Sequence, residues 1–254
     1  ALAFLVDDVT DLSPLRALRD LKQLDLRNDN DTRWDFPLRD LSPLSELKLE
    51  TLNVSGTKID DLTPLKGMPL KWLSVRGTPV SDLEPLRGKS IEMLDALYFP
   101  VRDFSVLSTL PLRHLECTIN NLELLRGLSL NYFVSNGSTL NDLTPLIGQP
   151  IEQLWMTRSN LLKPEDFKPF TTVRVMNVAA FNGIEPSVLK MLPQLESLNG
   201  KTRNEWLVDE ATPPGPSRER HPLEPQPRWP FDPEDGVEYV WSVPTNLEIG
   251  RAHV

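Results

Sequence analysis

The sequence predicts an α/β solenoid, in which short units of one strand and one helical turn stack side by side. The stretch DLTPLKGMPLKWL at 61–73 returns in a closely similar form as DLEPLRGKSIEML at 82–94. Self-similarity at a period of about 20–50 residues is the signature of a solenoid. The interval between apolar anchors is nearly constant, but longer between the second and third anchor and shorter between the sixth and seventh. The anchors are Leu2, Leu24, Leu52, Leu73, Leu94, Leu115, Phe133, Leu154, Met176 and Leu198.

One unit, residues 49–68, shows what each repeat contains. Leu52 and Val54 alternate with polar neighbours, which is the period-2 pattern of a half-buried strand. Apolar residues then recur three apart, as a tight 3₁₀ turn requires. Thr63 is a candidate cap for that turn, and Pro64 suits its first position, where no backbone N–H is needed.

No such unit can bury its leucines alone, so the units must stack. Stacking places the strands in a parallel sheet on the concave face and the short helical segments on the convex face, with a right-handed path. Each fully buried aliphatic side chain contributes about 1.5–3 kcal/mol, which makes the leucines the main source of stability.

The repeats resemble the leucine-rich repeat superfamily, within it the internalin-like bacterial type. The resemblance covers about residues 1–200, and it implies the solenoid fold. The family's buried asparagine is replaced here by hydroxyl residues, namely Thr57, Thr78, Ser138 and Ser159, and Phe99 occupies that position in the fifth unit. The D-L-x-P-L signature stands at 11–15, 40–44, 61–65, 82–86 and 142–146.

The segment KMLPQLESLNGKTRNEWLVDE at 190–210 is similar to the end of the repeat region in bacterial multidomain proteins that also carry a serine/threonine kinase domain. That resemblance implies a sensor or docking role in a larger protein. The sequence itself shows no glycine-rich loop, H-R-D or D-F-G motif, so we expect no kinase activity in this fragment.

The domain organisation follows from changes in composition. We expect a repeat domain of about nine units at 1–210, starting inside a repeat, and a proline-rich linker at 211–235. Residues 236–248 would begin an unidentified further domain, and 249–254 would be a non-native tail, since IGRAHV resembles a translated sequencing adapter. An insertion at 30–37 with Trp34 and Phe36 is either a tolerated surface loop or a binding loop.

Charge and cysteine content limit the function classes. A net charge of −9 without a basic stripe argues against a nucleic-acid partner. Cys117 stands alone at an inward strand position, which predicts a packing role and leaves the redox compartment open. No apolar run is long enough for a membrane span, and localisation stays open, with an extracytoplasmic or membrane-anchored full-length protein as one option.

No constellation for catalysis or a cofactor is found. The three histidines, His114, His221 and His253, fall on a strand, in the linker and in the tail, and no metal-binding or nucleophile motif occurs. The regular spacing of the acids that recur with the repeat predicts a structural role, in which each accepts a hydrogen bond from a turn N–H. It does not favour calcium binding, because single carboxylates one repeat apart lack the clustered oxygens of a calcium site. These acids are Asp11, Asp40, Asp61, Asp82 and Asp103.

Strand alternation predicts which side chains line the concave face. One column contains Gln23, Thr51, Trp72, Met93, His114, Tyr132 and Gln153; the next contains Asp25, Asn53, Ser74, Asp95, Glu116, Val134 and Trp155. We expect large exposed aromatic side chains bordered by acids, a composition typical of protein-binding hot spots. Stacking that only stabilises the sheet, and a carbohydrate or peptidoglycan site, are the alternatives. The predicted partner-binding residues are Trp72, Met93, Asp95, His114, Glu116, Tyr132 and Trp155.

These features together favour a non-catalytic scaffold that binds a protein partner through the concave sheet, as the sensor or docking part of a larger bacterial protein. One alternative is an accessory region of a serine/threonine kinase or another enzyme whose catalytic domain lies outside the fragment. A structural cell-surface repeat protein is the other. The sequence does not predict an oligomeric state.

Overall fold

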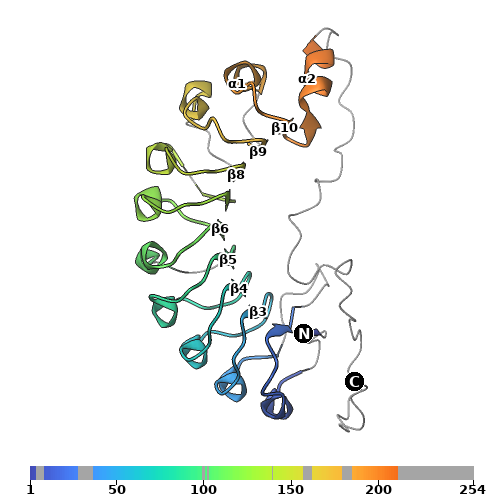
Figure 1. Ribbon diagram of the computed structural model, residues 1–254, viewed down its shortest axis with the longest axis vertical. Coiled ribbons are helices and arrows are strands. Elements are labelled where there is room, and N and C mark those ends of the chain that lie inside the picture. The colour runs from blue at the N-terminus through green and yellow to red at the C-terminus, as the bar shows by residue number, and fades with distance from the viewer. Residues whose placement is uncertain are drawn as a thin grey trace.

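The computed structural model describes residues 1–3, 9–27, 37–98, 101, 103–138, 140–156, 162–178 and 185–210. Within them the chain forms an open arc, with the strands along its inner face and the helical segments along its outer face (Figure 1). This is the predicted leucine-rich repeat solenoid. The predicted linker, further domain and tail at 211–254, the loop residues Trp34 and Phe36, and Phe99 and Ser159 lie outside the described residues.

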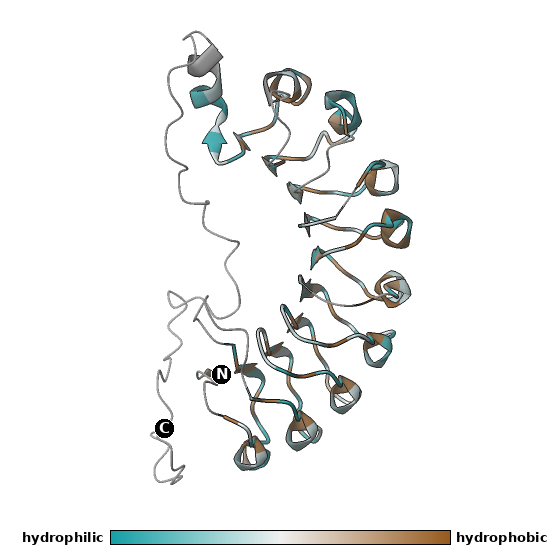
Figure 2. Cartoon of the chain, turned by 180° about the vertical axis from the view of Figure 1, so that it is seen from behind, coloured by the Kyte–Doolittle hydropathy of each residue, from teal (hydrophilic) through white to brown (hydrophobic). Residues whose placement is uncertain are grey.

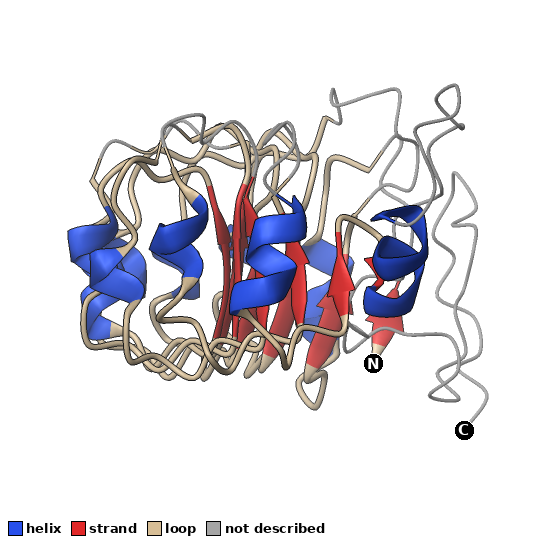
Figure 3. Cartoon of the chain, turned by 90° about the horizontal axis from the view of Figure 1, so that it is seen from above, coloured by secondary structure: helices blue, strands red, loops and turns tan. Residues whose placement is uncertain are grey.

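One sheet of eleven strands runs through the described chain in sequence order. Viewed from above, the strands stand side by side as separate rungs (Figure 3). The strands are β1 (Leu2–Ala3), β2 (Gln23–Asp25), β3 (Thr51–Asn53), β4 (Trp72–Ser74), β5 (Met93–Ala96), β6 (His114–Cys117), β7 (Tyr132–Ser135), β8 (Gln153–Met156), β9 (Val175–Asn177), β10 (Ser197–Leu198) and β11 (Lys201–Thr202).

Each strand from β1 to β8 is followed by a short 3₁₀ segment, and two α-helices stand near the end of the described chain. The 3₁₀ segments are η1 (Ser13–Ala17), η2 (Ser42–Leu44), η3 (Thr63–Leu65), η4 (Glu84–Leu86), η5 (Ser105–Thr109), η6 (Leu122–Leu125), η7 (Thr144–Leu146) and η8 (Pro164–Phe167); the helices are α1 (Glu185–Met191) and α2 (Arg203–Glu210). No helix among these is long and apolar enough to cross a membrane.

The anchor positions predicted from the sequence pair with one another in register. Leu52 pairs with Leu73, Leu73 with Leu94, and Leu94 with Leu115, all in parallel. Each of these leucines is fully buried. The apolar side chains lie between the strands and the outer helical segments, where Figure 2 shows the hydrophobic colour repeating from unit to unit.

The repeated aspartates cap the 3₁₀ segments. Asp61 Oδ1 accepts a hydrogen bond of 2.7 Å from the backbone N–H of Thr63, and Asp82 does the same for Glu84 at 2.7 Å. The predicted structural role of these acids is therefore confirmed. The expectation that Thr63 caps its own turn is wrong: the residue at the cap position is Leu62, which has no side-chain cap bond, and the carboxylate of Asp61 supplies the acceptor instead.

Thr57 and Thr78, which stand where the family has asparagine, each bond a turn carbonyl through the side-chain hydroxyl. Thr57 Oγ1 donates to the Val54 carbonyl at 2.7 Å, and Thr78 Oγ1 donates to the Val75 carbonyl at 2.7 Å. Both side chains are buried, so each bond satisfies a hydroxyl and a turn carbonyl that water does not reach.

The last two strands form a hairpin that ends the parallel ladder. β10 pairs with β11 antiparallel, and the connecting Asn199 and Gly200 both have positive φ, at 52° and 75°. Asn-Gly is the preferred pair for such a tight turn, because both residues tolerate that conformation. The hairpin leads into α2, whose Trp206 Nε1 donates to the Leu198 carbonyl at 2.8 Å.

Candidate functional site

The concave face contains the columns that the alternation predicts. Trp72 pairs with Met93, Met93 with His114, and His114 with Tyr132. In the second column Asp95 pairs with Glu116, and Val134 with Trp155. The seven predicted site residues therefore lie on one face of five adjacent strands, β4 to β8.

The expectation that the aromatic side chains of this face are exposed is wrong. Trp72 is only 4% exposed and Tyr132 only 5%, while Met93 and Trp155 are half-buried. The reason is the close spacing of parallel strands, about 4.8 Å, which lets neighbouring side chains of a column cover one another. The rings of His114 and Tyr132 show this directly: they stack at 3.8 Å between centroids with 16° between their planes.

Stacking, one of the alternative interpretations of these residues, is present. It does not account for the second column, where Asp95 is 6% exposed and Glu116 is 1% exposed. A buried carboxylate is costly unless a cation and hydrogen bonds compensate it. The compensating cation must therefore come from nearby on the same face.

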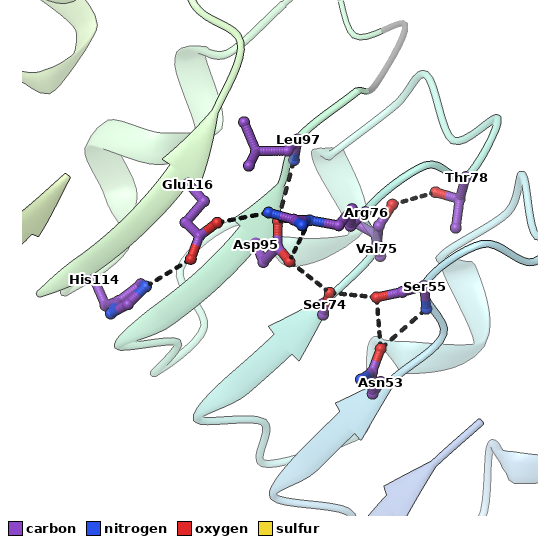
Figure 4. A network of polar contacts seen from close by, with 10 residues as sticks. All are labelled: Asn53, Ser55, Ser74, Val75, Arg76, Thr78, Asp95, Leu97, His114 and Glu116. Atoms are coloured by element: carbon purple, nitrogen blue, oxygen red, sulfur yellow. Dashed lines mark hydrogen bonds and ion pairs between the residues drawn. The ribbon is translucent and has the colours of Figure 1, made fainter. Parts of the chain in front are cut away.

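Arg76, one residue beyond Val75, which follows β4, supplies that cation. Its Nε lies 3.1 Å from Asp95 Oδ2, and its Nη2 donates to Glu116 Oε2 at 2.9 Å. Glu116 Oε1 lies 3.3 Å from His114 Nε2, so the ion pairs join the aromatic stack. Figure 4 shows the guanidinium between the two carboxylates, with side chains from three successive repeats converging on it.

The same network extends toward the N-terminus through hydroxyl groups. Ser74 Oγ lies 3.1 Å from Asp95 Oδ2 and 2.6 Å from Ser55 Oγ, which in turn lies 2.6 Å from Asn53 Oδ1 (Figure 4). The backbone N–H of Leu97 donates to Asp95 Oδ1 at 3.2 Å. A continuous set of polar contacts, which we call the concave network, thus links β3 to β6; its residues are Asn53, Ser55, Ser74, Arg76, Asp95, Glu116 and His114.

The electrostatics of the network reflect its burial. Burial raises the pKa of Asp95 to about 6, although the Arg76 charge acts in the opposite direction. For Arg76, burial alone would lower the pKa, but the charges of Asp95 and Glu116 outweigh it and the pKa is raised. Arg76 therefore stays charged, and the raised pKa of Asp95, about 6, brings its protonation change close to neutral pH.

Beside the network lies an apolar patch with two unused donors. Leu97, Tyr132 and Val134 form a cluster against which Trp155 packs. Tyr132 Oη and Trp155 Nε1 are both buried and have no hydrogen-bond partner among the described residues. Burial raises the pKa of Tyr132, so its hydroxyl keeps its proton and remains a donor. Within the described chain, the desolvation of these two donors is therefore not compensated by a hydrogen bond.

Sequence reasoning missed two residues of this face, Arg76 and Tyr98. Tyr98 is 60% exposed and has φ 57°, and the Arg76 guanidinium carbon lies 5.9 Å from the centroid of its ring. The signal was available in the repeat itself, because Gly56 and Gly77 occupy the equivalent positions of the two preceding units, with φ 74° and 64°. A tyrosine where two earlier units have glycine departs from the pattern.

The other described residues do not form a recognisable reactive or metal-binding site. Cys117 is fully buried, and burial raises the pKa of its thiol, so a packing role fits its surroundings. Among the described residues, no three histidine, cysteine, aspartate or glutamate side chains cluster as a metal site would require. The buried polar groups of the concave network are engaged with one another, an arrangement suited to a rigid surface.

Comparison with known proteins supports the fold. No protein-family model and no curated protein matches the sequence. Among solved structures, an internalin (inlF) from Listeria monocytogenes is similar, with a TM-score of 0.56 and 20% identity over 77% of this chain and 65% of that chain. An internalin C2 (inlC2) from the same species matches with a TM-score of 0.49 and 20% identity, over 76% and 77% of the two chains. This chain spans slightly less than two thirds of inlF, and at this identity the likeness shows the fold: an internalin-like leucine-rich repeat solenoid.

Proposed function

We propose that this protein is a non-catalytic scaffold that binds a protein partner through its concave face. The observation that carries the proposal is the pair of buried carboxylates, Asp95 and Glu116, held by Arg76 on that face. Buried ion pairs contribute little net stability compared with apolar side chains of similar size. Their presence on a sheet face is better explained by recognition than by folding.

Two further features support binding at this face. The strands hold the side chains on a rigid backbone, so little conformational entropy is lost when a partner docks. The apolar cluster around Tyr132 lies next to the ionic groups and carries two donors that lack acceptors within the described chain. An apolar centre with a few placed polar groups is the usual composition of a protein interface.

A finer part of the proposal concerns the context. We infer that the solenoid serves as the docking or sensor region of a larger bacterial protein. The support is the similarity of residues 190–210 to the end of the repeat region in multidomain proteins that carry a kinase domain. Sequencing the complete reading frame tests this part independently of the binding face.

Site-specific photo-crosslinking tests the binding face. A photoreactive amino acid at Gln153, half-buried on the concave face, is compared with one at Ile147, 48% exposed just after η7. After irradiation in a lysate of the source cells, we expect a discrete crosslinked protein from position 153 and none from 147. The purified partner should then bind the unlabelled chain, with weaker binding after Trp155→Ala.

Equal labelling from both positions, or labelling from 147 alone, contradicts a concave binding face. A crosslinked partner that binds the Trp155→Ala variant with unchanged affinity contradicts the role of the apolar cluster.

A further inference from the structure

Tyr98 stands at a turn whose backbone conformation, φ 57°, is unfavourable for an aromatic residue. The turn follows β5, and the equivalent turns after β3 and β4 use Gly56 and Gly77. Among the described residues, the only non-glycine residues with positive φ are Tyr98 and Asn199. Asparagine adopts this conformation readily, but an aromatic residue does so at a cost in free energy. A side chain that is 60% exposed recovers little of that cost by burial.

The polar groups beside Tyr98 have an unbalanced charge. Within the described part of the chain, Arg76 is the one arginine that contacts both Asp95 and Glu116, so two carboxylates share a single guanidinium. A third carboxylate brought by a partner would face two like charges at short range, which is unfavourable. A second cation would instead compensate the excess negative charge, and the net charge of −9 would attract it from a distance.

We propose, on the basis of the protein-binding function above, that Tyr98 receives a basic side chain, arginine or lysine, from the protein partner, beside the Arg76–Asp95–Glu116 cluster. Arg76 lies 5.9 Å from the ring centroid, near the outer limit of about 6 Å for a cation–π contact, and leaves most of the ring accessible. A second cation can therefore approach the exposed part of the ring, where the two buried carboxylates attract it electrostatically without direct contact. Tyr98 acts as the anchor, and the concave network sets the charge preference.

A random-peptide display selection on the immobilised chain tests this inference. Peptides selected on the unmodified protein are counter-selected against Tyr98→Gly, and their composition is read by sequencing. Tyr98→Gly is a useful variant because glycine suits φ 57°, so its melting temperature should equal or exceed that of the parent. Ile147→Ala, at a residue 48% exposed just after η7, is the matched control for losing an exposed apolar side chain.

We expect the peptides that discriminate against Tyr98→Gly to be enriched in arginine and lysine. Their affinity should fall about tenfold on Tyr98→Gly, which corresponds to about 1.4 kcal/mol, and stay unchanged on Ile147→Ala. Enrichment of acidic or neutral peptides overturns the inference, as does an absence of discriminating peptides.

The outcomes also separate this inference from the proposed function. Peptides that bind Tyr98→Gly fully but lose affinity on Trp155→Ala would retain the concave binding face and exclude the basic anchor. Peptides that are insensitive to both substitutions would contradict both proposals.

Discussion

The two faces of the same strands differ in how regularly their side chains repeat. On the side that faces the core, Leu94 belongs to a ladder of fully buried apolar residues that repeats from unit to unit. On the concave side its neighbour Asp95 joins an ionic cluster whose equivalents in the adjacent strands differ: Ser74 in one and Glu116 in the other. The core-facing side therefore maintains the fold by repeating the same apolar residues, while the residues of the concave face differ from one repeat to the next.

This difference shows which residues are free to carry function. Replacing one apolar core residue by another of similar volume changes the solenoid little, because the neighbouring rungs impose the same geometry. The concave network has no such redundancy, since Arg76 contacts two carboxylates and no other described arginine contacts them. Substitutions on the two faces should accordingly have different effects on the stability of the protein.

The largest expected effect comes from the core at Phe133, which is fully buried at an anchor position that is leucine in most other units. Phe133→Ala should lower the free energy of unfolding by about 3–5 kcal/mol, because it leaves a cavity that the neighbouring rungs cannot fill. Phe133→Leu restores the consensus side chain and should cost less than about 1.5 kcal/mol. Urea unfolding measures both free energies. Equal losses of stability for the two variants would contradict a packed ladder of anchor residues in the core.

The next largest effect is expected in the concave network. Arg76→Met leaves Asp95 and Glu116 buried without a cation, and should cost about 2–3 kcal/mol; this is less than for a fully enclosed pair because the arginine side chain is 34% exposed. Adding Glu116→Gln should recover part of the loss, because it removes one uncompensated charge. A double-mutant cycle on urea unfolding measures the coupling, and strict additivity would show that the two residues act independently.

The difference between the repeating core side and the varied concave side also explains how much of the structure the sequence predicts. The regular interval between the anchor residues determined the strand register in advance, and every anchor residue pairs as expected. Alternation also placed Trp72, Asp95 and Trp155 on the concave side correctly. These are consequences of backbone geometry, which a repeating pattern encodes directly.

Burial and contacts on the concave side were not predictable in that way. The sequence does not show that Arg76 reaches across two strands to Glu116, because its rotamer depends on neighbours in other repeats. Nor does alternation indicate that His114 and Tyr132 would cover one another by stacking. The departure from glycine at Tyr98 was the available signal, and it becomes evident only when the turns of successive units are aligned.

The pH dependence of stability should distinguish Asp95 from the acids of the outer turns. Its pKa is about 6 in the folded protein, above the ordinary value of 3.8. The contribution of Asp95 is thus fully present below pH 3.8 and is lost as the pH rises to about 6. The capping acids show the opposite sign: the pKa values of Asp61 and Asp142 are lowered by hydrogen bonds from Thr63 and Thr144, so their contribution is lost as the pH falls.

Asp95→Asn removes the first contribution and leaves the second unchanged. The free energy of unfolding of the variant minus that of the parent should therefore rise between about pH 4 and pH 6, by on the order of 1–2 kcal/mol, and then level off. Urea unfolding at several pH values measures this difference. A constant difference across that range would show that burial does not raise the pKa of Asp95.

The smallest effect is expected at the edge of the sheet where the strands begin, in a row of alternating charges that we call the rim ladder. Lys71 Nζ donates to Glu50 Oε2 at 2.8 Å, and Arg174 Nη1 donates to Glu196 Oε1 at 2.9 Å; each of the four side chains is at least 36% exposed. Glu50→Lys places a third positive charge beside Lys22 and Lys71, and should lower the melting temperature by no more than about 2 °C.

Salt should abolish the rim effect and leave the network effect in place. In about 0.5 M NaCl the Debye length is only a few Å, so exposed charges of the rim ladder are screened, whereas the buried contacts of Arg76 with Asp95 and Glu116 are not. The melting temperature of Glu50→Lys should then match that of the parent, while Arg76→Met should remain destabilised. If salt rescued Arg76→Met as well, the carboxylates of Asp95 and Glu116 would be accessible to solvent rather than buried.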